Sequence, residues 1–117
     1  MSLEKPIGPE AILEKKKKYI MPCLAHFYKE PRQFVKGEMQ YLFDSEGRKY
    51  LDCFAGVSVI NCGHCNPEIN AEVVKQVQSL QHVCNTYLTE NFVNLAEKLA
   101  EVTPGDLQKT FFCSTGT

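Results

Sequence analysis

Two short motifs in this sequence carry residue types that could do chemistry. Cys62-Gly63-His64-Cys65 places two thiols three positions apart, just before a predicted helix, as in sites of thiol–disulfide exchange. Ser114-Thr115-Gly116-Thr117 combines small residues with hydroxyl donors after an apolar run, which is typical of loops that hold a phosphate. Both motifs are short, so the surrounding helices and strands are needed to distinguish a catalytic or binding site from an ordinary turn.

The thiol hypothesis meets opposing features in the surrounding sequence. Asn66 and Pro67 delay the start of the helix, so Cys62 lies about one turn outside the reach of the helix dipole. The residues upstream predict an antiparallel meander instead of the βαβ order of a thioredoxin domain. Thiol–disulfide exchange at Cys62 and Cys65 therefore stays as the alternative function.

Zinc binding is a second alternative for the same motif. A lone CxxC without a second well-spaced pair is a weak zinc signal, and packing or turn roles are favoured for its residues. No metal site is predicted. The residues that would form one are Cys53, Cys62, His64, Cys65, His82 and Cys84.

Length and composition exclude several classes of protein. The chain has 117 residues, 44% of them hydrophobic, and a formal net charge of -1, which gives no reason to expect a nucleic acid or an anionic membrane as partner. No apolar run approaches the roughly 20 residues of a membrane-spanning helix. The first residues, 1–6, lack the apolar region of a secretory signal, so the six cysteines are expected to be reduced and packed as small hydrophobes. These features predict a soluble, cytoplasmic protein.

The first half of the chain predicts a helix followed by strands. A helix is expected over 9–20, with Lys15–Lys18 on its solvated face. Strands are expected over 33–36, ended by Gly37, over 39–44, and over 49–53 after a Gly47 turn. The short gaps between these runs predict a three-stranded antiparallel meander.

The second half predicts two amphipathic helices and one strand. Apolar residues at helical spacing indicate helices over 67–81, capped by Asn66, and over 91–102, capped by Thr89. Residues 109–113 are predicted to form a buried strand that leads into the hydroxyl-rich loop. Since no later strand follows to pair with it, we expect the 117 residues to be the beginning of a larger protein.

Four segments taken together, in this order and with these gaps, resemble the N-terminal portion of a known family. They are 41–52 (Tyr-Leu-Phe-Asp-Ser-Glu-Gly-Arg-Lys-Tyr-Leu-Asp), 54–57, 63–67 and 111–117. The family is that of the class III (ω-amino acid) pyridoxal-phosphate aminotransferases of fold type I, and its alanine–glyoxylate (type 2) and 4-aminobutyrate branches are the most similar. In this light Cys62-Gly63-His64-Cys65 is the family's Gly-His turn, which happens to carry cysteines.

The resemblance implies an α/β fold in which this chain supplies the N-terminal segment. Its elements would be a helix, a three-stranded antiparallel meander, two helices and the first strand of the large-domain sheet. Residues 1–60 would belong to the small domain, and residues 61–117 would begin the large cofactor-binding domain.

The resemblance also implies a function and its residues. The protein would transfer an amino group from an ω-amino acid or an alanine-type donor to a 2-oxo acid, as a homodimer whose two subunits share the active site. Pyridoxal 5'-phosphate would be held through its phosphate by Gly116 and Thr117, with Thr115 and Ser114 adjacent. The substrate pocket would include Val57, Ser58 and Tyr87. The Schiff-base lysine would lie beyond Thr117, so no catalytic residue is expected in this chain, and the chain alone is expected to be inactive.

Overall fold

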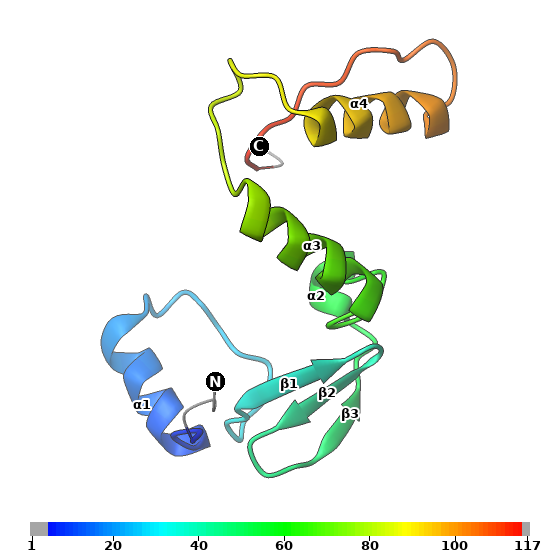
Figure 1. Cartoon of the computed structure of the whole chain (residues 1–117). Coiled ribbons are helices and arrows are strands. Elements are labelled where there is room, and N and C mark those ends of the chain that lie inside the picture. Colours follow the sequence, from blue (N-terminus) through cyan, green and yellow to red (C-terminus); the bar gives the residue numbers. More distant parts are fainter. Residues whose placement is uncertain (1–4, 116–117) are drawn as a thin grey trace. The chain divides into compact units, whose positions relative to one another are not determined.

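The computed structural model describes residues 5–115 of the chain. Its internal contacts divide the chain into two compact units, Met1–Lys75 and Gln76–Thr117. Figure 1 shows the elements of both units, coloured along the sequence. The expected boundary between residues 60 and 61 separates the family's small and large domains, and it stays a prediction.

Helix α1 (Pro9–Tyr19) opens the first unit (Figure 1). Pro9 occupies its first turn, where the fixed φ of proline suits a helix and its missing N–H leaves no bond unmade. The backbone N–H of Gly8 donates to Oε1 of Gln33 at 2.9 Å and ties the helix start to the chain that enters the sheet. The predicted helix is confirmed, and the lysine run lies at its last turns, where cations suit the helix dipole.

Three strands form the sheet of the first unit, in the order β1 (Phe34–Glu38), β2 (Tyr41–Asp44) and β3 (Lys49–Leu51). Both neighbouring pairs are antiparallel, with Gly37 opposite Leu42 and Tyr41 opposite Leu51. The predicted meander is therefore confirmed (Figure 1). Its strands are shorter than expected at β2 and β3 and longer at β1.

The prediction that Gly37 ends the first strand is wrong, because Gly37 lies inside β1. A Cβ atom at this position would lie 2.7 Å from Cβ of His64, closer than two carbon atoms approach without a shift. Gly37 therefore leaves room for a neighbouring loop instead of making a turn.

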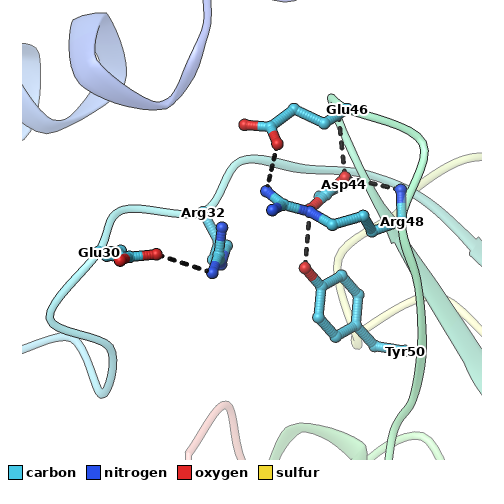
Figure 2. A network of polar contacts seen from close by, with 6 residues as sticks. All are labelled: Glu30, Arg32, Asp44, Glu46, Arg48 and Tyr50. Atoms are coloured by element: carbon cyan, nitrogen blue, oxygen red, sulfur yellow. Dashed lines mark hydrogen bonds and ion pairs between the residues drawn. The ribbon is translucent and has the colours of Figure 1, made fainter.

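Asp44, at the end of β2, is the one buried side chain among residues 5–115, with 3% of its surface exposed. Its Oδ1 accepts the backbone N–H groups of Glu46 and Arg48, and its Oδ2 accepts Nε–H of Arg48 and the hydroxyl of Tyr50, each at 2.8–3.0 Å (Figure 2). Burial alone would raise the pKa of Asp44, but these hydrogen bonds together hold it well below its usual range. All the partners belong to the β2–β3 hairpin, so this network fixes the turn at 45–47.

Two helices follow the sheet along the chain, α3 (Pro67–Ser79) and α4 (Glu90–Val102), as predicted. Asn66 caps α3, since its Oδ1 accepts the backbone N–H of Glu68 at 3.0 Å. Thr89 stands in the capping position of α4 but makes no side-chain hydrogen bond there.

The predicted strand over 109–113 is wrong, since these residues form no strand. A strand needs a neighbour whose N–H and C=O groups complete its ladder, and within the described part of the chain none of the strands β1, β2 and β3 pairs with this segment. In this segment the ring of Phe112 instead contacts that of Phe92 on α4, with the ring centroids 4.8 Å apart.

Across residues 5–115 no hydrophobic side chain is fully buried. The apolar stripes of α3 and α4, for example at Val73, Val77, Leu95 and Leu99, are exposed within the described chain. The six cysteines are exposed and free as well, which corrects the expectation that they pack as core residues. Local hydrogen bonds and the three-stranded sheet therefore provide most of the order.

We expect the isolated 117-residue chain to unfold without a sharp transition, because cooperative unfolding depends on buried apolar surface that these residues do not form. Circular dichroism during heating should show a broad, shallow loss of signal, and the dye ANS should bind at 25 °C. A steep transition without dye binding would contradict this expectation.

Candidate functional site

The segment after the sheet adopts a conformation that L-amino acids rarely take. Helix α2 (Ala55–Ser58) is a left-handed turn, with φ of 49° at Ala55, 60° at Gly56, 62° at Val57 and 61° at Ser58. Only the glycine adopts such angles freely, and each other residue bears a cost of roughly 1–2 kcal/mol. Strained backbone of this kind persists only where surrounding contacts hold it, and it gathers at functional sites.

One carboxylate holds the start of this turn. Oδ1 of Asp52 accepts the backbone N–H of Phe54 at 2.9 Å and that of Ala55 at 3.0 Å. Its second oxygen, Oδ2, lies 2.6 Å from Nε2 of His64. The hydrogen bond from His64, followed by those from Ala55 and Phe54, lowers the pKa of Asp52, so the carboxylate is charged at neutral pH and the histidine nitrogen donates.

The residues that join β1 to β2 hold His64 in place. Its backbone N–H and C=O pair with the C=O and N–H of Met39, both at 2.7 Å. Its ring lies against the face of Gly37 that lacks a side chain. Asp52, Ala55 and His64 line a cavity of about 430 Å³ together with neighbouring residues. The other lining residues are Met39, Gln40, Ile60, Asn61, Cys62 and Gly63.

The pairing of Asp52 with His64 was not predicted from the sequence. His64 was considered as part of a thiol or zinc motif and of the family's Gly-His turn, and Asp52 was given no role. An Asp three residues before a run that begins with Ala and Gly is a signal for a carboxylate that caps a turn. The partner of its second oxygen comes from a distant loop, which spacing along the chain does not reveal.

The residues predicted for the substrate pocket lie in both units. Val57 and Ser58 are two of the strained residues of α2, and the side chain of Val57 is exposed, with 73% of its surface accessible. Tyr87 belongs to the second unit, where its backbone N–H donates to the C=O of Cys84 in a turn, and 69% of its surface is exposed. Exposed apolar groups on irregular backbone are suited to binding a ligand.

The predicted phosphate loop is described only at its beginning. Ser114 and Thr115 form an exposed bend, in which Sγ of Cys113 donates to the C=O of Thr115 at 3.0 Å. Gly116 and Thr117 lie outside the described residues. The described part of the donor set fits a phosphate, since it offers two hydroxyl groups and no bulky side chain.

The alternative roles of the CxxC motif find no support in the geometry. Cys62 and Cys65 are exposed and free, and the ring of His64 between them is held by Asp52. Residues 5–115 contain no group of three or more His, Cys, Asp or Glu side chains that could hold a metal ion. In the same range, no helix is long and apolar enough to cross a membrane.

Known proteins are similar to this chain over most of its length. Residues 25–117 match the family described as Aminotransferase class-III. The alanine–glyoxylate aminotransferase 2 homolog 2 of Arabidopsis thaliana, named as mitochondrial, is 46% identical over 112 residues, which are 94% of this chain and 24% of that protein.

Two solved structures are similar to this one. A phospholyase from Arthrobacter in complex with phosphoethanolamine has a TM-score of 0.76 and 29% identity, over 86% of this chain and 23% of that one. An ornithine aminotransferase from Toxoplasma gondii, with partial occupancy of PLP at its active site, has a TM-score of 0.69 and 25% identity, over 79% of this chain and 21% of that one. The chain thus spans less than a quarter of the length of each of these proteins.

Proposed function

This chain belongs to the class III aminotransferase family, and from that premise we propose that it takes part in the pyridoxal-phosphate-dependent transfer of an amino group from an amino acid to a 2-oxo acid. The observation that carries the proposal is the family match, which runs over residues 25–117 and includes both the strained turn and the hydroxyl-rich loop. The similar structures have fold type I, and the thiol–disulfide alternative finds no support among the comparisons.

In the proposed function this chain binds one end of the cofactor. Small residues and hydroxyl groups at 114–117 surround the phosphate, with the backbone N–H groups at Gly116 and Thr117 as its principal donors. When bound, pyridoxal phosphate supplies the electron sink that amino transfer needs. The role of this loop is to hold the group in place.

The proposal assigns the substrate side of the pocket to Val57, Ser58 and Tyr87. The first two would present their side chains from the left-handed turn, and Tyr87 would contribute from the loop between α3 and α4. Two copies of the protein would share each active site. These residues would orient the amino acid and exclude water from it.

No lysine of the described chain is proposed as catalytic. Lys75 and Lys98 pair with Glu72 and Glu101 on exposed helix faces, and Lys49 lies over the ring of Tyr41 on the sheet. The remaining lysines of residues 5–115 are exposed or half-exposed. The catalytic lysine is therefore proposed to lie outside the described residues.

A hybrid enzyme tests the proposal. In it this chain replaces the 112 matching residues of the Arabidopsis relative. We expect the hybrid enzyme to transfer the amino group of alanine to glyoxylate, measured as pyruvate formed, whereas the isolated chain and the relative with that segment deleted should be inactive. An inactive hybrid enzyme that folds and binds the cofactor, or an active isolated chain, would contradict the proposal.

The same hybrid enzyme distinguishes the possible amino donors. Alanine, ornithine and phosphoethanolamine represent the three similar proteins. We propose an alanine-type donor, because the Arabidopsis relative has the highest identity of the three. Release of inorganic phosphate from phosphoethanolamine would instead indicate a phospholyase.

A prediction for the pocket concerns Tyr87. Replacing Tyr87 with alanine in the hybrid enzyme should raise KM for the amino donor roughly 10-fold, because an exposed aromatic ring that covers a ligand contributes about 1–2 kcal/mol. Tyr87→Phe keeps the ring and should stay within about twofold of the parent. Steady-state kinetics with alanine as the amino donor measure both values. An unchanged KM in Tyr87→Ala would show that Tyr87 does not line the pocket.

The cellular location stays part of the proposal. A cytoplasmic location was expected, whereas the Arabidopsis relative is named as mitochondrial. Fractionation of cells that express the natural gene, followed by immunoblotting, separates the two locations.

A further inference from the structure

The hydrogen bonds around Asp52 connect the strained turn to the sheet. We propose that Asp52 and His64 are positioning residues that hold the left-handed turn 55–58 in the conformation that receives the amino donor. This inference rests on the proposed function, because it assumes that Val57 and Ser58 line the substrate pocket. We call the pair of side chains Asp52 and His64 the clamp.

The turn needs an external hold because three of its four residues have side chains. Ala55, Val57 and Ser58 all have φ near +50° to +60°, and Val57 is β-branched, which makes that region especially unfavourable. Without restraint such residues return to negative φ and turn their side chains to other directions. The position of Val57 and Ser58 therefore depends on whatever restrains the turn.

The clamp restrains the turn at its first residue. Asp52 accepts the N–H groups of both Phe54 and Ala55, so it fixes two successive peptide units. The C=O of Ala55 accepts the N–H groups of Val59 and Ile60, at 2.8 and 2.9 Å. The N–H and the C=O of Ala55 are thereby both held by hydrogen bonds. Residues 56–58, which lie between Ala55 and Val59, keep the left-handed conformation under this restraint.

His64 gives the clamp a rigid base. The paired backbone bonds with Met39 hold the residue at the end of the sheet, and the absence of a side chain at Gly37 sets how closely its ring approaches β1. The clamp is largely screened from solvent, with 10% of the Asp52 side chain and 20% of the His64 side chain exposed. A bond between a charged carboxylate and a ring N–H is strong in such surroundings. The sheet therefore sets the geometry of the turn through two side chains.

The geometry favours positioning over a direct chemical role. Nε2 of His64 is engaged by Asp52, and both oxygens of Asp52 already have partners within the chain. Residues 5–115 provide no third ligand that would make the pair a metal site. The role that remains for the pair is to hold the backbone of the left-handed turn.

Kinetics of the hybrid enzyme test the inference. Asp52→Asn and His64→Ala should each raise KM for the amino donor roughly 10- to 100-fold while kcat stays within about threefold, because the displaced turn loses contacts that bind the donor equally in the ground state and the transition state. Gly37→Ala should act in the same direction, since the new Cβ displaces the ring of His64 without removing it. The double variant with both clamp residues replaced should be no worse than Asp52→Asn alone, because the two act as one unit.

Two matched variants separate positioning from general damage. His64→Gln places an N–H donor where Nε2 lies and should restore KM to within about threefold of the parent, which a loss of packing would not allow. Glu46→Gln, in the exposed turn of the neighbouring hairpin, should leave both kinetic constants unchanged. The positioning role is wrong if His64→Gln raises KM as much as His64→Ala does. It is also wrong if kcat falls while KM rises in every clamp variant.

Hydrogen exchange provides a readout that does not depend on amino transfer. In the hybrid enzyme, mass spectrometry of the peptide 53–60 should show roughly 10-fold faster exchange at Phe54 and Ala55 in Asp52→Asn and His64→Ala, and parent-like exchange in His64→Gln. Unchanged exchange would overturn the clamp even in an inactive protein. Faster exchange in a hybrid enzyme that never transfers amino groups would instead retain the clamp and reject the proposed function.

Discussion

Replacing Asp44 with asparagine should lower the unfolding temperature of the hybrid enzyme by roughly 5–10 °C, the largest effect we expect from any single change outside the phosphate loop. Asp44 is buried and charged, and it accepts four hydrogen bonds from its own hairpin. An asparagine could still accept the two backbone N–H groups through Oδ1. Its amide NH₂ would then face the guanidinium of Arg48, where two donors oppose each other.

Two control variants rank the contributions to this network. Tyr50→Phe removes one hydrogen bond and leaves the charge paired, so its loss of stability should be clearly smaller than that of Asp44→Asn. Glu46→Gln removes an ion pair with Arg48 whose side chains are about half exposed, and it should change the unfolding temperature by no more than about 1 °C. Differential scanning calorimetry measures all three. An Asp44→Asn variant as stable as Glu46→Gln would show that the network does not support the fold.

The pH dependence of the same variants follows from the lowered pKa of Asp44. Its folded pKa lies below the unfolded value of about 3.9, so the stabilisation is fully present above roughly pH 5 and is lost as the pH falls below 4. The difference in unfolding temperature between the parent and Asp44→Asn should therefore shrink on acidification from pH 5 to pH 3. A difference that stays constant over this range would contradict the ionised role.

Replacing Gly116 with valine should weaken binding of pyridoxal phosphate to the hybrid enzyme about 100-fold, equivalent to about 2.7 kcal/mol. Donation from backbone N–H groups requires the phosphate to come close to the main chain, and a β-branched side chain obstructs that approach. Thr117→Val keeps the backbone donor and removes only a hydroxyl, so we expect a loss of about 10-fold. Absorbance titration with the cofactor measures both.

Pyridoxal without its phosphate is the matched control for this prediction. Because the loop is proposed to hold only the phosphate, Gly116→Val should change the affinity for pyridoxal by less than about threefold. If both ligands lose affinity equally, the variant has damaged the site in general. If neither loses affinity, the phosphate is held elsewhere.

The regular elements were largely predictable because local rules determine them. The meander follows from strand-favouring residues separated by short turns, and the helix after Asn66 follows from a capping side chain, a proline and apolar residues at helical spacing. The strand expected over 109–113 was wrong for a reason that is not local. An apolar run becomes a strand only when another strand pairs with it, and no strand of the described chain pairs with residues 109–113.

The left-handed turn could not be predicted from residue preferences. Val57 favours extended backbone and Ala55 favours right-handed helix, so both oppose the conformation that the structure shows. Contacts between residues that are distant in sequence override these preferences, since Asp52 bonds to His64 twelve positions later. The role of Gly37 depends on the same long-range approach, which is why a turn was predicted where β1 continues.

A crystal structure of the hybrid enzyme with bound pyridoxal phosphate would show whether this chain holds the phosphate of the cofactor. We expect phosphate oxygens within about 3.2 Å of the backbone nitrogens of Gly116 and Thr117. We also expect the left-handed turn bearing Val57 and Ser58 to border the same pocket. A phosphate bound by other residues, or a turn remote from the cofactor, would contradict the claim that this chain holds one end of the cofactor and one wall of the substrate site.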